Sequence, residues 1–206
     1  MRPLAFAAIS LLSLATLASL WLTTPQAAAQ MLPDIEPAAL QTPQMAPAER
    51  QVLRFLRSYH TGLADRQLPA IAKTLVAEAE HRALDVDLVL AVIFVESSGY
   101  NFAVSPVGAR GLMQIMPNTG QDLARRHGHR WHGPDALFDP ILNLKLGTTY
   151  LRELLDHYDG DIETALAAYN WGPGHVDRRI ASGQRLPRLY LRLVRDALEQ
   201  RIDQRS

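Results

Sequence analysis

The chain has 206 residues, a length that suits one domain with short appendages. Basic and acidic residues number 21 each, so the formal net charge is zero and gives no reason to expect nucleic acid as a partner. The absence of cysteine excludes disulfides and a lipid-bearing cysteine, so we expect an apolar core alone to hold the folded part together.

Residues 1–29 have the pattern of a signal peptide. Arg2 supplies a positive charge, residues 4–22 are apolar apart from scattered serine and threonine, and residues 27–29 are three alanines that suit cleavage before Gln30. The apolar stretch is about 19 residues long, near the lower limit for crossing a bilayer, so an uncleaved anchor is the alternative. The pattern predicts a protein that is periplasmic or otherwise exported and is not stably inserted in the membrane once the signal peptide is cleaved.

Residues 30–49 predict an extended linker, because four prolines among alanine, glutamine and methionine cannot bury a core. Helical signals dominate the rest of the chain, and we expect one domain over residues 50–206. Apolar residues recur at helical spacing in two early segments, namely Leu53, Leu56 and Tyr59, and then Ile71, Leu75 and Ala79.

Residues 85–99 predict the central helix of the domain. Asp85 is a typical helix cap, and residues 88–95 are apolar almost all round, which is the pattern of a helix buried on every side. This helix runs into Glu96, and Gly99 is a natural stop behind it.

Four further helices are expected along the rest of the chain. Their predicted caps or first residues are Asn118 (ending near His127), Asp139-Pro140 (running to about Tyr158), Asp161 (ending at Asn170) and Pro187. No segment alternates as a strand does, so the fold class is all-α, with a small hairpin around residues 100–112 as the one exception left open.

Glu96 is the first candidate for chemistry. It directly follows five apolar residues, and burial among such neighbours disfavours the ionised carboxylate and raises its pKa. A carboxylic acid still protonated near neutral pH is the proton donor that glycosidic-bond cleavage needs. The alternative is a glutamate that merely caps or pairs near a helix end.

Residues 102–117 form a loop-like stretch that adds polar recognition groups. Gln114 offers both donors and acceptors, which suit sugar hydroxyl and acetamido groups. Met113 and Met116 have core filling as their simpler explanation.

Three motifs, taken together, resemble those of family 1 lytic transglycosylases. The first joins Glu96-Ser97-Ser98 to the stretch from Ala103 to Pro117, the second is Asn143-Leu144-x-x-Gly147-x-x-Tyr150-Leu151, and the third runs from Ala167-Ala168-Tyr169-Asn170 to Val176. They occur in the family's order over roughly residues 67–200. The first motif is long and specific, the third is moderately specific and the second is weak by itself.

The resemblance implies a lysozyme-like helical fold and non-hydrolytic cleavage of peptidoglycan between N-acetylmuramic acid and N-acetylglucosamine. It implies that Glu96 protonates the glycosidic oxygen and then accepts a proton from the muramic acid C6 hydroxyl, which leaves a 1,6-anhydro ring. The implied substrate contacts are Ser105 at the N-acetyl group, Gln114 and Met116 along the groove, Tyr169 orienting Glu96, and Asn170 supporting the groove.

One departure from the family pattern lies near the C-terminus. The family usually has a proline, a Glu-Thr pair and then Tyr-Val, whereas residues 187–191 keep Pro187 and Tyr190 without the Glu-Thr pair. Tyr190 is the candidate for the place of the family's tyrosine, and the far wall of the groove stays open.

Neither a second catalytic carboxylate nor a metal is expected. Asp122 and Asp135 lie in polar surroundings, and Asp139 is explained as a helix cap. The histidines at positions 127, 129 and 132 lie close together but match no zinc signature, so a surface loop is the preferred interpretation. We therefore expect no cofactor.

Two other functions compete with the transglycosylase. A hydrolytic muramidase of similar fold would leave reducing ends, and a non-catalytic peptidoglycan-binding or assembly module would leave none. We expect a monomer acting on glycan strands. The sequence is equally compatible with wall recycling, division or service to an envelope-spanning secretion or conjugation machine, and it does not distinguish exo from endo action.

Overall fold

The computed structural model describes residues 45–203, with side chains as far as residue 200. The expected signal peptide and nearly all of the expected linker lie outside the described residues. The helices are α1 (Pro47–Ser58), α2 (Leu68–His81), α3 (Val86–Ser97), α4 (Pro117–Arg126), α5 (Pro140–His157), α6 (Ile162–Trp171), α7 (Pro173–Ala181) and α8 (Leu189–Asp203), with short 3-10 helices η2 (Asp65–Gln67) and η3 (Pro134–Phe138).

The expectation of an all-α fold is confirmed for the part of the chain that the structure describes. Its only β-type pairs are two isolated bridges, from Val104 to Arg110 and from Arg110 to Ile115, in the loop between α3 and α4. The hairpin left open around residues 100–112 is thus present only as these bridges. Over residues 45–203, no helix is long and apolar enough to span a membrane.

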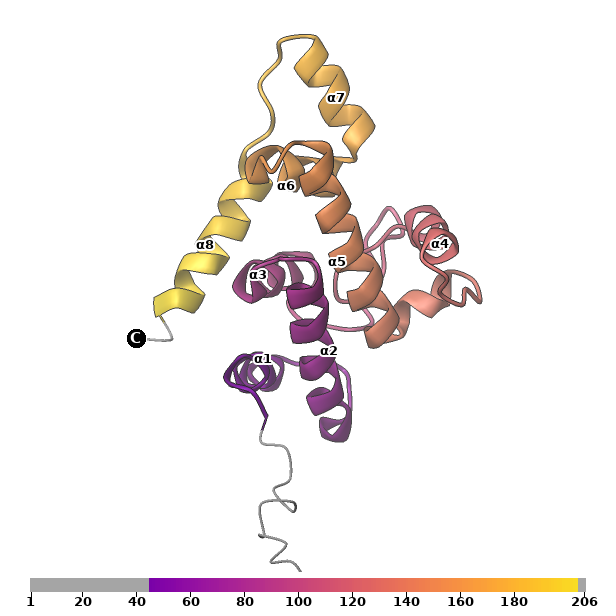
Figure 1. The fold of residues 1–206 in the computed structure, drawn as a ribbon, viewed down its shortest axis with the longest axis vertical. Coiled ribbons are helices and arrows are strands. Elements are labelled where there is room, and N and C mark those ends of the chain that lie inside the picture. Colours follow the sequence, from indigo (N-terminus) through magenta and orange to yellow (C-terminus); the bar gives the residue numbers. More distant parts are fainter. Residues whose placement is uncertain (1–44, 204–206) are drawn as a thin grey trace, which may run out of the picture. The chain divides into compact units, whose positions relative to one another are not determined.

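Helix α3 is the buried centre of the domain, as its sequence predicts. Every residue from Leu88 to Ile93 is buried, and the five residues from Val89 to Ile93 are fully inaccessible. α3 packs against α2 and α8, while α2 also packs against α1 and α5 (Figure 1). Because apolar side chains cover α3 all round, burying it against several helices at once removes the most apolar surface from water.

Aspartate caps place three of the helices where the sequence predicts them. The Asp85 carboxylate accepts a hydrogen bond from the Asp87 amide at 2.7 Å, and Asp139 and Asp161 accept bonds from the first free amides of α5 and α6. Each carboxylate satisfies backbone donors that the helix itself leaves unpaired.

Helix α4 begins earlier than expected, so the prediction that Asn118 caps it is wrong. Pro117 occupies the first helical position, and Met116, in extended conformation, is the cap residue. Proline suits that position because it has no N–H to leave unpaired. Asn118 therefore lies inside the first turn.

Two other boundaries and one whole helix differ from expectation. Helix α1 starts at Pro47, so helical structure begins inside the segment expected to be linker. Helix α8 starts at Leu189, two residues after Pro187. Helix α7 was not expected at all, because Gly172-Pro173-Gly174 has the composition of a turn; Pro173 instead opens a new helix.

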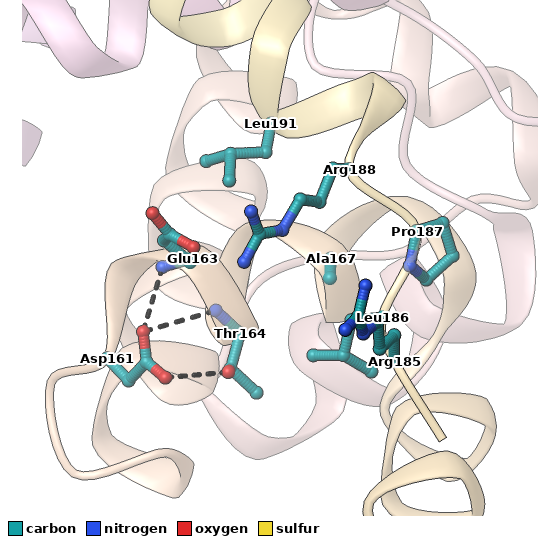
Figure 2. A pocket seen from close by; sticks show the side chains of 9 residues that line it. All are labelled: Asp161, Glu163, Thr164, Ala167, Arg185, Leu186, Pro187, Arg188 and Leu191. Atoms are coloured by element: carbon teal, nitrogen blue, oxygen red, sulfur yellow. Dashed lines mark hydrogen bonds between the residues drawn. The ribbon is translucent and has the colours of Figure 1, made fainter.

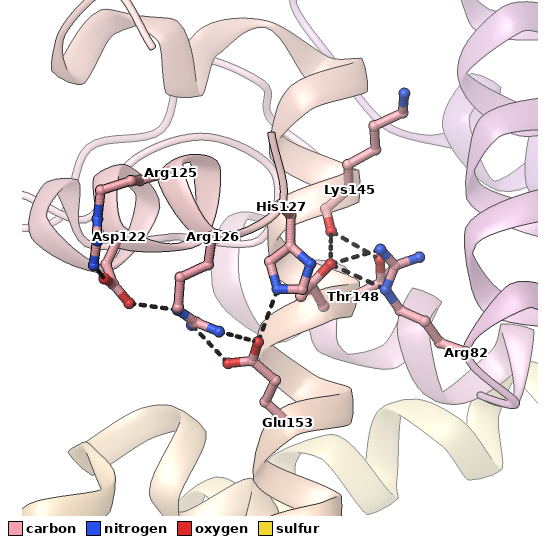
Figure 3. A network of polar contacts seen from close by, with 9 residues as sticks. Arg82, Asp122, Arg125, Arg126, His127, Lys145, Thr148 and Glu153 are labelled. Carbon is pink, nitrogen blue, oxygen red and sulfur yellow. Dashed lines mark hydrogen bonds and ion pairs between the residues drawn. The ribbon is translucent and has the colours of Figure 1, made fainter. Parts of the chain in front are cut away.

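The charged residues of α4 form a surface network with α5 (Figure 3). Arg126 donates to both oxygens of Glu153, at 2.6 and 2.8 Å, and also to Asp122 at 2.8 Å. His127 lies 3.0 Å from the same Glu153 carboxylate, and Arg125 pairs with Asp122. The network ties the end of α4 to α5, so Arg125 and Arg126 are both paired with carboxylates of the domain itself.

Candidate active site

Glu96 lies on the last turn of α3, at the end of the buried apolar run. Ser98 closes the helix in the left-handed conformation, and Gly99 follows with φ +78°, so the chain turns away immediately behind the carboxylate. Burial raises the pKa of Glu96 from 4.5 to about 7, and a hydrogen bond from Tyr190 opposes part of that rise. The carboxyl group is therefore protonated in a large fraction of molecules at neutral pH.

Tyr190 is the direct partner of Glu96. Its hydroxyl donates to Oε1 of Glu96 at 2.6 Å, across 94 positions in sequence. Tyr190 is itself buried, on the first turn of α8, and burial together with the nearby carboxylate raises its own pKa well above 10, so the hydroxyl keeps its proton and remains a donor. Tyr190 thus reaches Glu96 without the Glu-Thr pair that usually precedes the family's tyrosine.

Tyr169 lies near Glu96 but does not bond to it, so the expectation that its hydroxyl orients the carboxylate is wrong. Burial raises the pKa of Tyr169 well above its ordinary value, and the negative charge of Glu96 raises it further. The hydroxyl, however, donates to the backbone carbonyl of Met113 at 2.9 Å. Tyr169 therefore fixes the loop opposite Glu96, and Tyr190 contacts the carboxylate.

The loop between α3 and α4 is fastened to the residue beside Glu96. The Ser97 hydroxyl, which can donate one hydrogen bond, lies 2.7 Å from the Leu112 carbonyl and 3.0 Å from that of Ile93. Leu112 and Met113 are fully buried, in agreement with core filling as the role of Met113. The loop's position relative to Glu96 is thus set by contacts to α3 and α6.

Gln114 has a conformation and bonding that sequence did not predict. Its φ is +47°, a left-handed value uncommon for a residue with a side chain. Its side-chain amide donates to the carbonyls of Ala103 and Gly111, both at 3.0 Å. Both N–H groups are therefore used within the loop, and the oxygen is the part of the amide left for another partner.

Ser105 also serves the loop itself. Its hydroxyl oxygen accepts a bond from the Ala109 amide at 3.0 Å, while its backbone amide donates to the Ala109 carbonyl. Because a hydroxyl both accepts and donates, the proton of Ser105 stays available. The structure thus assigns Ser105 a turn-forming role and leaves it one donor.

The other two expected contacts are exposed. Met116, the cap residue of α4, is 41% exposed, which separates it from the buried Met113. Asn170 is exposed near the end of α6, one residue after Tyr169. No hydrogen bond among the described residues joins Ser105, Met116 or Asn170 to Glu96.

Asn143 is a site-supporting residue that the sequence analysis quoted only as part of the weak second motif. It is completely buried on α5; its Oδ1 accepts from the Met113 amide at 2.8 Å, and its Nδ2 donates to the carbonyls of Arg110 and Leu137, both at 2.9 Å. Asn143 thus binds the backbone amide of Met113, and Tyr169 binds the backbone carbonyl of the same residue.

The structure also explains why glycine stands at position 147, in the same motif. A Cβ added there would lie 2.3 Å from the sulfur of Met113 and 2.7 Å from its Cβ. Only a residue without a side chain lets Met113 lie this close to α5. Spacing alone could have placed residues 143 and 147 on one face of a helix, but it could not have identified their shared partner, Met113, in an earlier loop.

Replacing Asn143 by leucine should destabilise the domain by about 3–5 kcal/mol, because a buried amide and two carbonyls lose their partners together. Urea unfolding followed by circular dichroism measures the change, and Asn118→Leu, at an exposed position of α4, is the matched control. A loss below about 1 kcal/mol would show that the loop does not depend on Asn143.

The other acidic candidates lie in structural contacts. Asp135 pairs with Arg110, Asp139 caps α5, and Asp122 belongs to the surface network of Figure 3. Across residues 45–203, no group of three or more histidine, aspartate or glutamate side chains is arranged to hold a metal ion. Glu96 is thus the carboxylate of this site, with Tyr190 as its partner.

The family model for the transglycosylase SLT domain matches residues 74–189, more than half of the chain. The chain belongs to the transglycosylase SLT domain family. The match covers the segment that holds Glu96, the loop behind it, Asn143 and Tyr169, and it ends one residue before Tyr190. The resemblance seen in the three motifs is thereby confirmed.

Relatives of the SLT domain include enzymes from a phage and from bacteria. The transglycosylase of Enterobacteria phage PRD1 is 40% identical over 121 residues, covering 52% of this chain and 42% of the phage protein. The membrane-bound lytic murein transglycosylase C of Serratia proteamaculans (strain 568) is 36% identical over 129 residues, covering 58% of this chain and 35% of that protein. The chain thus spans less than half the length of these relatives.

Solved structures support the expected lysozyme-like helical fold of the SLT domain. An inactive glutamate-to-glutamine variant of lytic transglycosylase Slt from Pseudomonas aeruginosa matches with a TM-score of 0.51 and 32% identity, over 62% of this chain and 21% of that one. The 70 kDa soluble lytic transglycosylase of Escherichia coli matches over the same shares, with a TM-score of 0.51 and 26% identity.

Proposed function

We propose that this protein is a peptidoglycan lytic transglycosylase. It cleaves the bond between N-acetylmuramic acid and N-acetylglucosamine without water and leaves 1,6-anhydromuramic acid ends. The observation that carries the proposal is the half-buried carboxyl group of Glu96, which is hydrogen-bonded to Tyr190 and has a pKa of about 7. Names of relatives, which include lytic murein transglycosylases, support the same reaction.

One carboxyl group suffices for this chemistry. Protonated Glu96 gives its proton to the glycosidic oxygen, which leaves as the hydroxyl of N-acetylglucosamine. The resulting carboxylate accepts the proton of the muramic acid C6 hydroxyl while that oxygen bonds to C1. A pKa near 7 suits a group that acts in turn as acid and base. Ordinary glycosidases need a second carboxylate to activate water or to attack, whereas the hydrogen-bond partner of Glu96 is a tyrosine hydroxyl, that of Tyr190.

The groove contacts follow from the groups that the loop leaves unsatisfied. The Ser105 hydroxyl donates to the carbonyl of the muramic acid N-acetyl group, and the Gln114 amide oxygen accepts from a sugar hydroxyl or acetamido N–H. Exposed Met116 offers an apolar surface to the sugar, while Asn170 supports the groove beyond Tyr169. These assignments use only donors and acceptors left over after the internal bonds are counted.

The proposed setting is the periplasm, reached through the N-terminal segment. Relatives named as membrane-bound and as soluble lytic murein transglycosylases are consistent with an envelope location. We propose a monomer that acts on glycan strands and can serve an envelope-spanning machine or wall turnover. It uses no cofactor.

The reaction products separate the proposal from its alternatives. Digestion of purified peptidoglycan in heavy-oxygen water should yield anhydro ends without solvent oxygen, because the C6 hydroxyl and not water attacks C1. Mass spectrometry of the released muropeptides measures both features. Labelled reducing ends as the main product would identify a hydrolytic muramidase, and the absence of new ends would identify a non-catalytic binding module.

A further inference from the structure

A cavity of about 640 Å³ lies where α1 ends and α2 begins. Its wall consists of residues 59–65, which connect the two helices, together with Leu56, Arg57 and Leu68. All of these residues precede residue 74, where the match to the SLT domain begins, and none belongs to the candidate active site. The cavity is therefore a feature of this chain outside the matched SLT segment.

Polar side chains without a partner line this cavity. Arg57, His60 and Asp65 are exposed, and their side chains form no hydrogen bond or ion pair with any described residue. The Thr61 hydroxyl accepts from the Leu63 amide at 3.2 Å, which leaves its own proton free to donate. The cavity thus offers a cation, an imidazole, a carboxylate and a hydroxyl to a ligand that carries several polar groups.

Four aromatic rings continue from the rim of the cavity and are called here the aromatic row (His60, Tyr100, Phe102 and Phe138). The His60 ring stacks on Tyr100, with centroids 5.7 Å apart and planes 16° from parallel. Phe102 lies 6.0 Å from Tyr100 and 5.8 Å from Phe138, and the Arg110 guanidinium lies 5.6 Å from the Phe138 centroid. Tyr100 and Phe102 are 38% and 45% exposed, so the row leaves apolar ring surface in contact with water.

Backbone contacts hold the aromatic row against the cavity. The amide of buried Asn101 donates to the Thr61 carbonyl at 2.9 Å, and its side-chain amide donates to the Phe138 carbonyl at 2.8 Å. Gly62 lies so close to Tyr100 that an added Cβ would be 2.8 Å from the tyrosine ring. Three segments that are far apart in sequence are thus joined, and the cavity and the row form one preformed surface.

The combination of exposed rings and unpartnered polar groups indicates the class of ligand. A pyranose ring has apolar faces of C–H groups, which pack on aromatic rings, and polar edges of hydroxyl or acetamido groups, which need donors and acceptors. The cavity between α6 and the segment leading into α8 differs in this respect, because the described residues that line it include no aromatic side chain (Figure 2). Only the cavity at the end of α1 joins both features.

We propose that this cavity and the aromatic row form a second glycan site, which holds N-acetylated sugars of a peptidoglycan strand without cleaving them. The identity of the ligand rests on the proposed function. The carboxylate of this site, Asp65, is exposed, so the site lacks the partly desolvated acid that Glu96 provides for cleavage. The aromatic row begins only four residues after Glu96, on the loop that follows α3. A strand held there keeps the enzyme on its polymer between cleavage events.

Binding of a sugar without peptide stems tests the site directly. The probe is the tetramer of β-1,4-linked N-acetylglucosamine, titrated into ¹⁵N-labelled Glu96→Gln protein and followed by NMR. Amide signals of residues 60–62 and 100–102 should shift as one group. In the same background, Tyr100→Ser with Phe102→Ser should weaken that binding about tenfold, as expected when several ring contacts are lost. Ile180→Ser removes an exposed apolar side chain from α7 and should leave the binding unchanged.

A second variant keeps the test valid if the loss of two rings unfolds the domain. Arg57→Gln with Asp65→Asn changes only exposed polar groups of the cavity and should also weaken tetramer binding severalfold. Shifts confined to signals around Glu96 would show that no second site exists, and an affinity unchanged by both double variants would exclude this surface. Either result overturns the proposal.

Turnover separates a second site from support of the catalytic loop. In protein that retains Glu96, Tyr100→Ser with Phe102→Ser should slow the release of anhydro ends from limiting insoluble peptidoglycan about tenfold. Cleavage of a soluble tetrasaccharide of alternating N-acetylglucosamine and N-acetylmuramic acid should stay within about twofold. Equal losses on both substrates, or sedimentation showing that the rings join two copies of the chain, would refute the proposal. Tetramer binding at the aromatic row without anhydro products would leave the second site standing and refute the proposed reaction.

Discussion

Glu96→Gln should reduce the release of anhydromuropeptides from purified peptidoglycan by roughly 10⁴-fold, toward the upper limit for loss of general acid–base catalysis. The amide cannot give a proton to the glycosidic oxygen, and it cannot accept one from the C6 hydroxyl. Both steps depend on the same group, so one change removes both. Release of muropeptides within tenfold of the unaltered protein would refute the assignment of Glu96.

The stability of Glu96→Gln tests whether its loss of activity comes from the missing acid and not from unfolding. A carboxyl group with a pKa of 4.5 in the unfolded chain and about 7 in the fold lowers stability as pH rises between those values, because only the unfolded chain gives up its proton freely. The penalty reaches about 3 kcal/mol above pH 7. Glu96→Gln, which is always neutral, should therefore match the unaltered protein in urea unfolding at pH 4 and exceed it at pH 8. A less stable variant at pH 8 would contradict the burial of Glu96.

Tyr190→Phe should lower kcat roughly tenfold and move the alkaline limb of the pH–rate profile to higher pH. The phenol donates to the carboxylate and so lowers the pKa of Glu96. Without that bond the pKa rises further, and the acid stays protonated to a higher pH. The loss of rate corresponds to one hydrogen bond to a charged group, of about 1.5 kcal/mol or more. Initial rates of anhydro-end formation between pH 4 and 9 measure both effects.

Tyr169→Phe is the matched control for that experiment. It removes the same atom from a neighbouring buried tyrosine, whose hydroxyl bonds the Met113 carbonyl and not the carboxylate. Its rate should fall, because the loop loses an anchor, but the limbs of the pH profile should stay in place. A shift caused by Tyr169→Phe and not by Tyr190→Phe would reverse the roles assigned to the two tyrosines.

Much of this protein could be predicted from local sequence. The apolar run of residues 88–95 determines that α3 is buried, and a carboxylate directly behind such a run must be partly desolvated. The aspartates at 85, 139 and 161 mark helix starts because capping depends on neighbouring backbone groups alone. The three motifs and their order were sufficient to indicate the family.

Only the tertiary structure decided which groups meet. Two buried tyrosines, at 169 and 190, lie near Glu96, and a motif cannot tell which hydroxyl reaches the carboxylate, because that depends on how α6 and α8 pack on α3. The role of Asn143 likewise depends on its hydrogen bond with Met113, which lies 30 residues away in the chain. A cap is a contact within one turn, whereas these contacts join separate elements, and their geometry is fixed only when the whole core is packed.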